Sequence, residues 1–344
     1  MFLFGLEFGG VTFPWASATV ICLIIFGIVV VGLFFVNEGY IAKYPIMPLR
    51  LFKRRSNIAA YAVCFVHGFV FISGSFFLPL YFQAVLGASP LLSGVYIFPF
   101  VLSLSFTAAG TGVYIRKTGQ YLPPIWFGLT LMTLGFGLYI NFPSHASWPR
   151  IILFQIIAGL GVGPNFQAPL IALQSLIEPR DIATATATFG FTRNLATSIS
   201  VVIGGVIFQN GMAKRQHTIL SALPPSVASE LGGGSAGANT ALVGHLPPSQ
   251  RAIATEAYTQ SLSTIWIFYT CVGVVGLAAS FAIGKQTLSK THEVTKTGLD
   301  AQQAARAERM GQEKLRREEK RRSAESKGVS GKETFVGGGV KEEV

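Results

Sequence analysis

The clearest chemical signal in this sequence is a single charged side chain inside a long apolar stretch. Arg193 lies between Thr192 and Asn194, and no other charged residue occurs between Asp181 and Lys214. A guanidinium in apolar surroundings costs several kcal/mol unless it faces water, a partner or a cavity. Arg193 therefore either reaches backbone carbonyls or the membrane surface, or lines an aqueous cavity. In a cavity it could bind anionic or polar cargo, or a proton-carrying carboxylate.

Other polar side chains inside apolar runs are candidates for the same kind of cavity. One run contains Gln155, Asn165 and Gln167, whose spacing does not place them all on one helix face. Together with Asn194 they either line a binding cavity or form hydrogen bonds between helices, worth about 0.6 kcal/mol each. His67 is another candidate, because an imidazole titrates near neutral pH and could relay protons. The alternative for His67 is a packed neutral side chain.

A glycine-rich stretch interrupts the run that holds these amides. Gly159, Gly161 and Gly163 alternate with apolar residues, and Pro164 follows them. A phosphate-binding loop does not fit inside an apolar run, whereas small residues let helices approach closely and proline kinks a helix. We therefore expect helix packing and a hinge at this stretch. Irregular backbone next to Gln167 would be of the kind that lines transport sites.

The sequence contains no recognisable catalytic motif. It has no G-x-S-x-G, no H-E-x-x-H, no P-loop and no G-x-G-x-x-G sequence. Cys22, Cys64 and Cys271 lie singly inside apolar runs, without a C-x-x-C or any spacing of metal ligands. We therefore predict no enzyme activity, no cofactor and no bound metal.

The composition places these residues in a membrane. Of the 344 residues, 50% are hydrophobic and 12% are charged, with a mean hydropathy of +0.50. A soluble domain carries about 25% charged residues, and more than half of the charges here fall within residues 285–344. This excludes a soluble enzyme, a nucleic-acid-binding domain and a disulfide-rich secreted module. The net charge of +11 lies in short loops and one tail, which indicates a lipid bilayer as partner and no nucleic acid.

Seven apolar runs are long enough to cross a bilayer as helices, since about 20 residues span its hydrocarbon core. They cover residues 17–36, 58–80, 92–114, 123–141, 151–174, 183–208 and 262–284. Residues 1–8 are apolar but too short to cross, and Glu7 near their end is expected to be a solvated helix end. The predicted fold is an all-α polytopic transmembrane helical bundle with seven full spans and an N-terminal partial span.

Basic residues in short loops predict the orientation of these spans. The loop after the first full span contains Lys43, Arg50, Lys53, Arg54 and Arg55. The next loop, 81–91, contains no charge, and loops rich in basic residues alternate with loops poor in them, so the basic side is predicted to be cytoplasmic. Residues 1–16 then end a truncated span and form an external loop. The loop 209–261 is predicted to be extracellular and mostly irregular with room for a short helix, and the charged tail 285–344 to be cytoplasmic, either helical or disordered.

Short stretches along the first two thirds of the chain resemble one family. They are GLEFGG (5–10), FPW (13–15), MPLRLF (47–52), LPLYFQ (78–83), GQY (119–121), GLGVGPNFQAP (159–169) and ATATATFGFTRN (183–194). As a set they resemble the C-terminal half of a fungal major facilitator superfamily transporter of the fourteen-span drug:proton antiporter type. The partial first segment is then similar to the end of the seventh span, and the seven full runs are similar to spans eight to fourteen.

This resemblance implies a plasma-membrane transporter that exports hydrophobic drugs, toxins or metabolites, with protons as the coupling ion. Alternatives on the same scaffold are a carrier for siderophore–iron or another small molecule, and an inactive membrane fragment. The family's N-terminal half, with its Gly-Asp-Arg loop and antiporter Gly-Pro motif, is absent from this sequence. Because alternating access needs two halves, we expect either a truncated gene product or a half that pairs with another chain, and we favour truncation.

Overall fold

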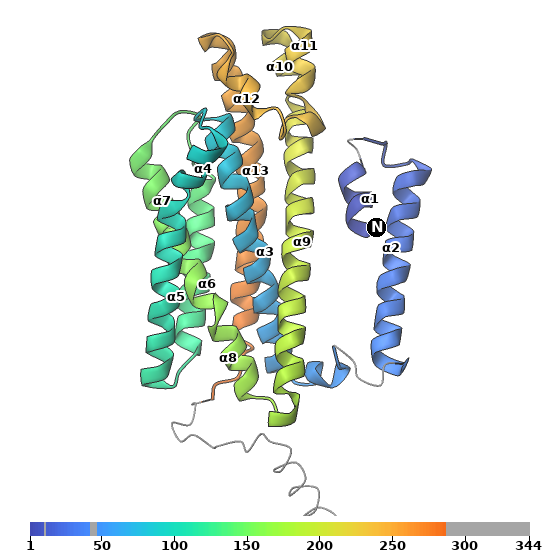
Figure 1. Cartoon of the computed structure of the whole chain (residues 1–344), viewed down its shortest axis with the longest axis vertical. Helices are drawn as coiled ribbons and strands as arrows, with labels where there is room; N and C mark the ends of the chain where they lie inside the picture. Colours follow the sequence, from blue (N-terminus) through green and yellow to red (C-terminus); the bar gives the residue numbers. More distant parts are fainter. Residues whose placement is uncertain (10–11, 42–46, 287–344) are drawn as a thin grey trace, which may run out of the picture. The chain divides into compact units, whose positions relative to one another are not determined.

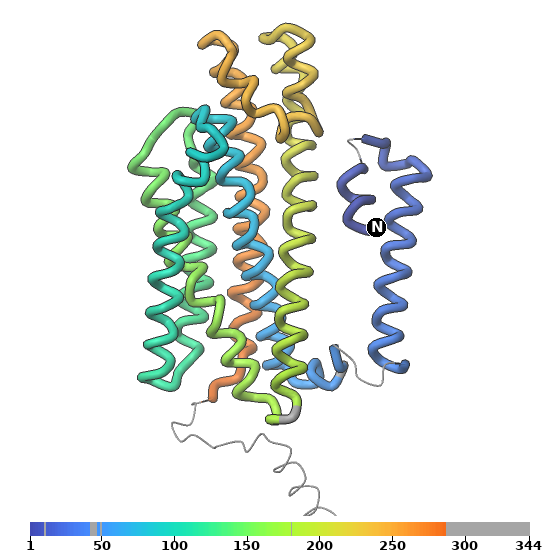
Figure 2. Tube along the Cα trace, in the orientation of Figure 1, coloured from blue at the N-terminus to red at the C-terminus, as the bar shows by residue number. Residues whose placement is uncertain are grey.

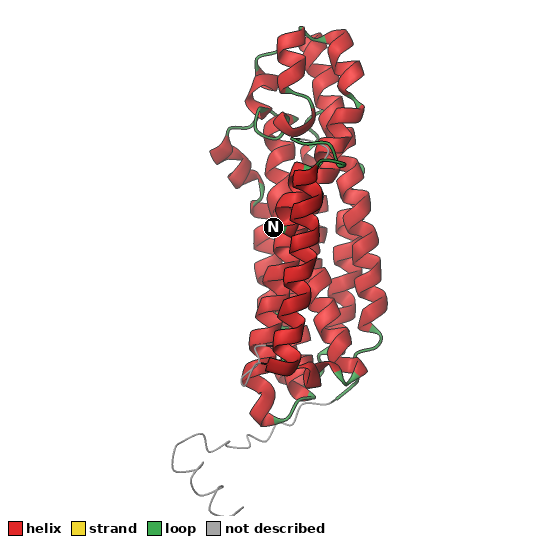
Figure 3. Ribbon diagram, turned by 90° about the vertical axis from the view of Figure 1, so that its right-hand side faces the viewer, coloured by secondary structure: helices red, strands yellow, loops and turns green. Residues whose placement is uncertain are grey.

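The computed structural model describes residues 1–9, 12–41 and 47–286 of the chain. Contacts divide the chain into a unit over residues 1–288, which holds every described residue, and a second unit over 289–344. The tail predicted over 285–344 therefore lies almost wholly outside the described residues, as does Lys43. In the described part every regular element is a helix (Figure 3), which confirms the all-α prediction.

Seven helical segments in the described residues are long and apolar enough to cross a membrane, and this confirms the predicted number. They are α2 (Ala18–Val36, continued by a π turn to Ile41), α3 (Arg55–Ala84), α5 (Phe98–Thr118), α6 (Leu122–Tyr139), α7 with α8 (Trp148–Val162 and Ala168–Ser175), α9 (Ile182–Lys214) and α13 (Pro248–Ser280). The short helix α1 (Phe2–Phe8) precedes them. In lipid, such segments form helices because only a helix satisfies all of its own backbone hydrogen bonds.

Local sequence signals fix where several helices begin and end. The Ser17 hydroxyl accepts a backbone N–H at the start of α2, and the Ser89 hydroxyl does the same at the start of α4 (Pro90–Tyr96). Gly119 ends α5 in the left-handed conformation, with φ of 71°, which glycine adopts without strain. These residues satisfy helix ends that would otherwise leave backbone groups without a partner.

The bundle has two groups of closely packed helices. Helix α13 contacts α3, α6 and α9, whereas α7 packs between α5 and α6 (Figure 1). Aromatic rings fill the space where α3, α6 and α13 meet. The ring of Trp266 lies 5.1 Å from that of Tyr139, which stacks on Phe142 at 4.8 Å. Phe142 in turn stacks on Tyr81 of α3 at 4.8 Å and on Phe154 of α7 at 6.0 Å, so these rings join the two groups.

Helix α2 is the least covered of the long helices. Val20 and Gly27 are its buried residues, and its other side chains are largely exposed. It packs on α1, which also contacts α9, and the Phe34 ring stacks on Phe191 of α9 at 5.8 Å. An exposed face rich in Ile, Val and Phe is unfavourable in water, so this helix faces lipid or another protein surface.

The predicted span 92–114 is divided in the structure. Helix α4 ends before Ile97, and α5 begins at Phe98. Pro99 lies in the first turn of α5. A proline has no backbone N–H and its ring excludes a continuous helix through the preceding turn. The sequence pattern was therefore right about an apolar run and wrong about its continuity.

The segment 209–261 differs most from its prediction as a mostly irregular loop. Helix α9 continues to Lys214, and α13 already begins at Pro248. Between them lie α10 (Gln216–Ala222), α11 (Pro225–Glu230) and α12 (Thr240–Gly244). The first turns of α13 bury Tyr258, whose hydroxyl donates to the Ala236 carbonyl at 2.7 Å. Only one face of these turns is buried, and the other face carries polar residues. The polar residues lower the mean hydropathy from which the sequence prediction placed the ends of the spans.

Candidate functional site

The candidate site forms where the fifth predicted span is broken. Helix α7 stops at Val162, a 3-10 turn covers Gly163–Phe166, and α8 starts at Ala168 (the break can be followed in Figure 2). Pro164 and Pro169 lie at the starts of the turn and of α8, and neither has an N–H to donate to a regular helix. The break therefore places irregular backbone inside a membrane span, next to α3 and α9.

Arg193 of α9 reaches this break. Its Nη2 donates to the Phe166 carbonyl at 3.0 Å, and the guanidinium carbon lies 5.2 Å from the centroids of the Phe166 and Phe189 rings. The side chain is half-buried, and its Nε is buried without a hydrogen-bond partner among the described residues. Carbonyl and ring contacts stabilise the charge at this depth. The Nε–H donor of the guanidinium remains without an acceptor in the described part of the chain.

His67 of α3 meets the same turn from another side. Its Nε2 lies 3.0 Å from the Val162 carbonyl, which assigns the hydrogen to Nε2. The imidazole packs edge-on against the Phe166 ring at 4.8 Å and parallel to Phe71 at 6.2 Å. Its Nδ1 is buried and has no partner in the described part of the chain. Phe166 thus connects His67 and Arg193, two residues that the sequence only suggested separately.

The predicted amides do not form one cluster with these residues. Asn165 and Gln155 are fully buried, whereas Gln167 and Asn194 are exposed. Asn165 lies against Gly128 of α6 and donates to the Gly161 carbonyl at 3.4 Å. Gln155 has both amide atoms buried without a partner within the described residues. Sequence reasoning did not select Phe166 and Phe189, because a phenylalanine in an apolar span carries no distinguishing signal.

The glycines next to the break allow α7 to contact two helices through its backbone. A Cβ built at Gly159 or Gly163 would overlap atoms of α5, and one built at Gly161 would overlap the Met132 backbone in α6. Small residues four apart present one such face, and the residue between them presents the opposite one. Pro164 completes the stretch by ending α7. The arrangement is suited to close packing immediately before the 3-10 turn, and a hinge at this stretch stays a prediction.

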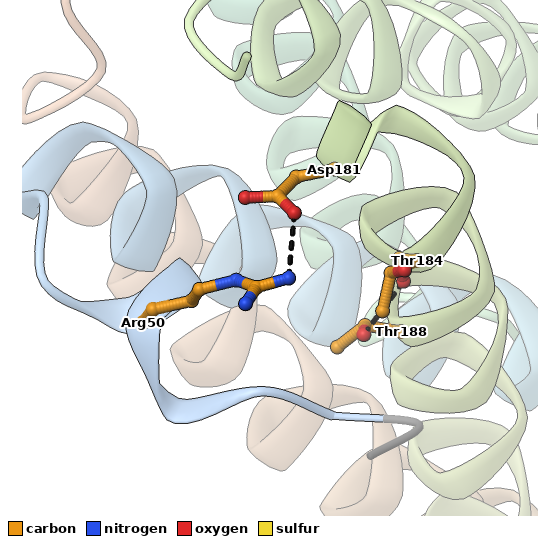
Figure 4. A network of polar contacts seen from close by, with 4 residues as sticks. All are labelled: Arg50, Asp181, Thr184 and Thr188. Atoms are coloured by element: carbon orange, nitrogen blue, oxygen red, sulfur yellow. Dashed lines mark hydrogen bonds and ion pairs between the residues drawn. The ribbon is translucent and has the colours of Figure 1, made fainter. Parts of the chain in front are cut away.

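A second polar group joins two connections at one end of the bundle (Figure 4). Arg50 Nη2 lies 2.7 Å from Asp181 Oδ1, which links the segment before α3 to the start of α9. The Asp181 side chain is 11% exposed and that of Arg50 is 56% exposed. Arg54 adds a hydrogen bond from Nη1 to the Leu176 carbonyl at 2.8 Å. Loops that the charge pattern places on one membrane side therefore contact one another.

The described residues show no group of three or more His, Cys, Asp or Glu side chains placed to hold a metal ion. The thiol of Cys64 lies beside Arg193 and is buried. In the same described part, no carboxylate pairs with the Arg193 guanidinium. The site therefore offers a cationic donor, an imidazole and aromatic rings, which suits binding of polar or anionic groups.

Comparison with known proteins identifies relatives of this chain. A family model described as Major Facilitator Superfamily matches residues 2–201. The efflux pump dotC of Dothistroma septosporum is 53% identical over 305 residues, covering 89% of this chain and 52% of the pump. The MFS-type transporter ppz2 of Metarhizium majus is 47% identical over 325 residues, covering 94% and 56%. The chain spans about half the length of the curated relatives it matches.

A solved structure shows the same fold. It is the crystal structure of a bacterial homologue of the human lysosomal transporter Spinster, in an inward-facing and occupied conformation. The match has a TM-score of 0.51 and 14% sequence identity, and it covers 80% of this chain and 60% of the other. Similarity at this identity concerns the arrangement of the helices.

Proposed function

The chain belongs to the Major Facilitator Superfamily, and we propose that it acts in proton-coupled efflux of drugs, toxins or small hydrophobic metabolites. As a member of this family with seven candidate spans, it is a multi-pass membrane protein. Efflux is supported by the relative named as an efflux pump, which is 53% identical. The plasma membrane as its location, and a cytoplasmic C-terminus, are parts of the same proposal.

The observation that carries the proposal is the contact of Arg193 with the broken span. The guanidinium is held by the Phe166 carbonyl and by two rings, while its Nε stays without a partner. A buried donor without an acceptor costs about 1–3 kcal/mol. A polar or anionic group of the cargo, or a carboxylate that gives up its proton, would remove that cost. Binding of proton and cargo would then alternate at one position.

The 3-10 turn supplies the element that can change between two arrangements. Movement of Phe166 alters its contacts with both Arg193 and His67, because both residues touch its ring. A ligand shifts such an equilibrium only by binding the two arrangements with different affinity. In the proposed cycle, cargo binds the arrangement of the turn in which the Arg193 guanidinium is free to donate hydrogen bonds to it. Protons favour the other arrangement of the turn.

Alternating access requires a second half opposite this one. The relatives are about twice as long as this chain, so the opposing half is proposed to come either from the same polypeptide or from another chain. The exposed Gln167 and Asn194 lie next to Phe166 and Arg193 in sequence, and we assign them to the face that meets this half. The opposing half would also supply the carboxylate for Arg193.

The test is dye accumulation in yeast cells that lack their own drug exporters. The 344-residue chain is produced alone, and also joined to the N-terminal half of the Dothistroma pump, with the anionic dye fluorescein, loaded as its diacetate, as the probe. The joined form is expected to lower dye accumulation, and a protonophore is expected to abolish the difference. Equal accumulation in cells with the joined form and in cells with an empty vector, at matched surface expression, would refute efflux of this dye.

A further inference from the structure

A groove of about 410 Å³ lies between α5 and α6, close to the turn that joins these helices at the lower end of the bundle in Figure 1. Helix α7 packs between α5 and α6, but it ends at Val162. Beyond Pro164, which lines the groove, the chain continues as α8, and α8 packs mainly on α3. The groove therefore forms where α7 no longer fills the space between its two neighbours.

The walls of this groove are apolar. Phe106 of α5 and Phe127 of α6 line it, and these side chains are 76% and 55% exposed. Gly110 lines it between them, and nothing lies within 4 Å of a Cβ built there. The Thr107 hydroxyl donates to a carbonyl of its own helix, so it needs no partner in the groove. From Phe106 to Tyr114 the groove follows α5 for about 12 Å, which is most of the hydrocarbon depth of one leaflet.

A lysine is held at the end of the groove where α5 turns into α6. The Tyr121 hydroxyl in this turn donates to the Gly284 carbonyl at 2.6 Å, and this bond keeps the next residue, Lys285, beside the turn. Lys285 lines a hollow of about 120 Å³ that adjoins the groove, because Pro123 lines both. Trp126 lines the same hollow, and tryptophan is enriched at the level of the lipid headgroups.

Lys117 adds a second positive charge at this end. It follows Gly110 and Tyr114 by seven and three residues, so it lies on the face of α5 that borders the groove. The sequence contains no Asp or Glu between Glu38 and Glu178, so α5, α6 and α7 carry no negative side chain. Both lysines are exposed, and neither has an ion pair among the described residues. The ligand that complements this end of the groove is therefore an anion.

We propose that this surface binds one anionic phospholipid, with an acyl chain in the groove between Phe106 and Phe127 and the headgroup at Lys117 and Lys285. A free phosphate would leave the groove unfilled, and a zwitterionic phospholipid would bring its own ammonium group toward the lysines. The charge pattern predicts that this end of the bundle is cytoplasmic, and anionic lipids give that leaflet its negative surface potential. The proposal goes beyond efflux and does not depend on it, since lipid binding can be measured without transport.

The experiment counts lipids bound to the purified 344-residue chain by native mass spectrometry, with phosphatidylserine and phosphatidylcholine of identical acyl chains as probes. The wild type is expected to bind one phosphatidylserine at least about fivefold more tightly than phosphatidylcholine. Lys117→Gln and Lys285→Gln should each weaken phosphatidylserine binding about fivefold, because each removes one charge near the headgroup. Lys53→Gln is the matched control, since Lys53 is an exposed lysine that lines neither hollow. It should bind both lipids as the wild type does.

A second pair of variants tests the groove without changing any charge. Gly110→Leu places a side chain in the groove, whereas Gly112→Leu places the same side chain on α5 outside the lining, and both positions have nothing within 4 Å of a built Cβ. Gly110→Leu should weaken phosphatidylserine binding about tenfold and Gly112→Leu should not. Glycerophosphoserine, which has the headgroup and no acyl chain, should not displace the lipid.

Three results would overturn the proposal, whatever the efflux assay shows. The first is equal binding of phosphatidylserine and phosphatidylcholine by the wild type. The second is equal affinity of Gly110→Leu and Gly112→Leu for phosphatidylserine, which would place the lipid elsewhere on the chain. The third is displacement of the lipid by glycerophosphoserine, which would show that the headgroup alone is recognised and that the groove contributes nothing.

Discussion

A single methyl group at Gly161 should separate two helices that contact each other through their backbones. The Cβ of Gly161→Ala would lie 2.6 Å from the Met132 Cα and would overlap the Met132 nitrogen, whereas ordinary contacts begin at 3.4 Å. Helix α6 would have to retreat by roughly 1 Å. Because the clash is with backbone, no rotamer change relieves it. Overpacking costs about 1–3 kcal/mol, and we expect the upper end of that range here.

The assay is thermal unfolding of the purified chain in detergent, followed by tryptophan fluorescence. Trp266 is buried against Tyr139, a residue of the helix that must move. A loss of about 3 kcal/mol should lower Tm by roughly 4 °C for a chain of 344 residues. Gly112→Ala in α5 is the matched control, because nothing lies within 4 Å of its Cβ position. It should leave Tm unchanged or raise it slightly, since alanine favours helix.

The reasoning fails if the two alanine variants have the same Tm within about 1 °C, a shift that corresponds to less than 1 kcal/mol. Such a result would mean that α6 and α7 adjust to the methyl group at little cost. The contact between α7 and α6 would then not require glycine, and the hinge assigned to the stretch before Pro164 would lose its structural basis.

Three further outcomes test the proposed function and orientation. In the joined efflux protein, Arg193→Ala should abolish dye export at normal surface expression. Arg193→Lys should not restore export, because lysine lacks the planar guanidinium group. Unchanged export in these variants would exclude Arg193 from the transport mechanism. Asp181→Asn should lower stability by about 1 kcal/mol, visible as a small Tm decrease that 1 M salt reproduces in the wild type. In a cysteine-free background, Ser235→Cys should react with a membrane-impermeant maleimide on intact cells and Ser323→Cys should not; the reverse pattern would invert the orientation.

The number of spans could be predicted because lipid imposes a simple requirement on the sequence. A run such as residues 17–36 must satisfy its backbone internally, and a helix is the only way for a single segment to do so. The structure has α2 at Ala18–Val36, within one residue of that prediction at its start. No packing information was needed, because α2 buries little of its surface against the rest of the chain.

The ends of α9 and α13 could not be predicted in the same way. Residues 248–261 contain Arg251 and Glu256, which lower the hydropathy, yet they form the first turns of α13. These turns are stable because one face packs against the chain, for example through Tyr258. That burial depends on α10 to α12 folding over the same end, which is a tertiary property and leaves only a weak pattern in the sequence.

At the candidate site, too, the sequence predicts that a residue needs a partner but does not predict which atom is the partner. Lipid physics predicts that Arg193 needs a partner, and the structure provides the Phe166 carbonyl, which lies 27 residues earlier in the chain. The sequence could not identify that carbonyl, because which atoms face α9 depends on how the chain turns after Pro164. Glu7 of α1 and Gln209 of α9 likewise line one cavity, and the sequence around neither residue predicts this.

Buried polar atoms without a hydrogen-bond partner say more about ligand binding than buried polar atoms that have one. A satisfied buried group is already explained by the fold, whereas an unsatisfied group costs free energy that a partner would recover. Within the described residues, Arg193 Nε is buried without an acceptor and Gln209 Oε1 is buried without a donor. The Arg193 nitrogen needs an acceptor and the Gln209 oxygen needs a donor, and a hydroxyl group or a water molecule can supply either. The two unsatisfied atoms are separated by 16 residues of α9, or about 24 Å along the helix, so a single small ligand does not satisfy both.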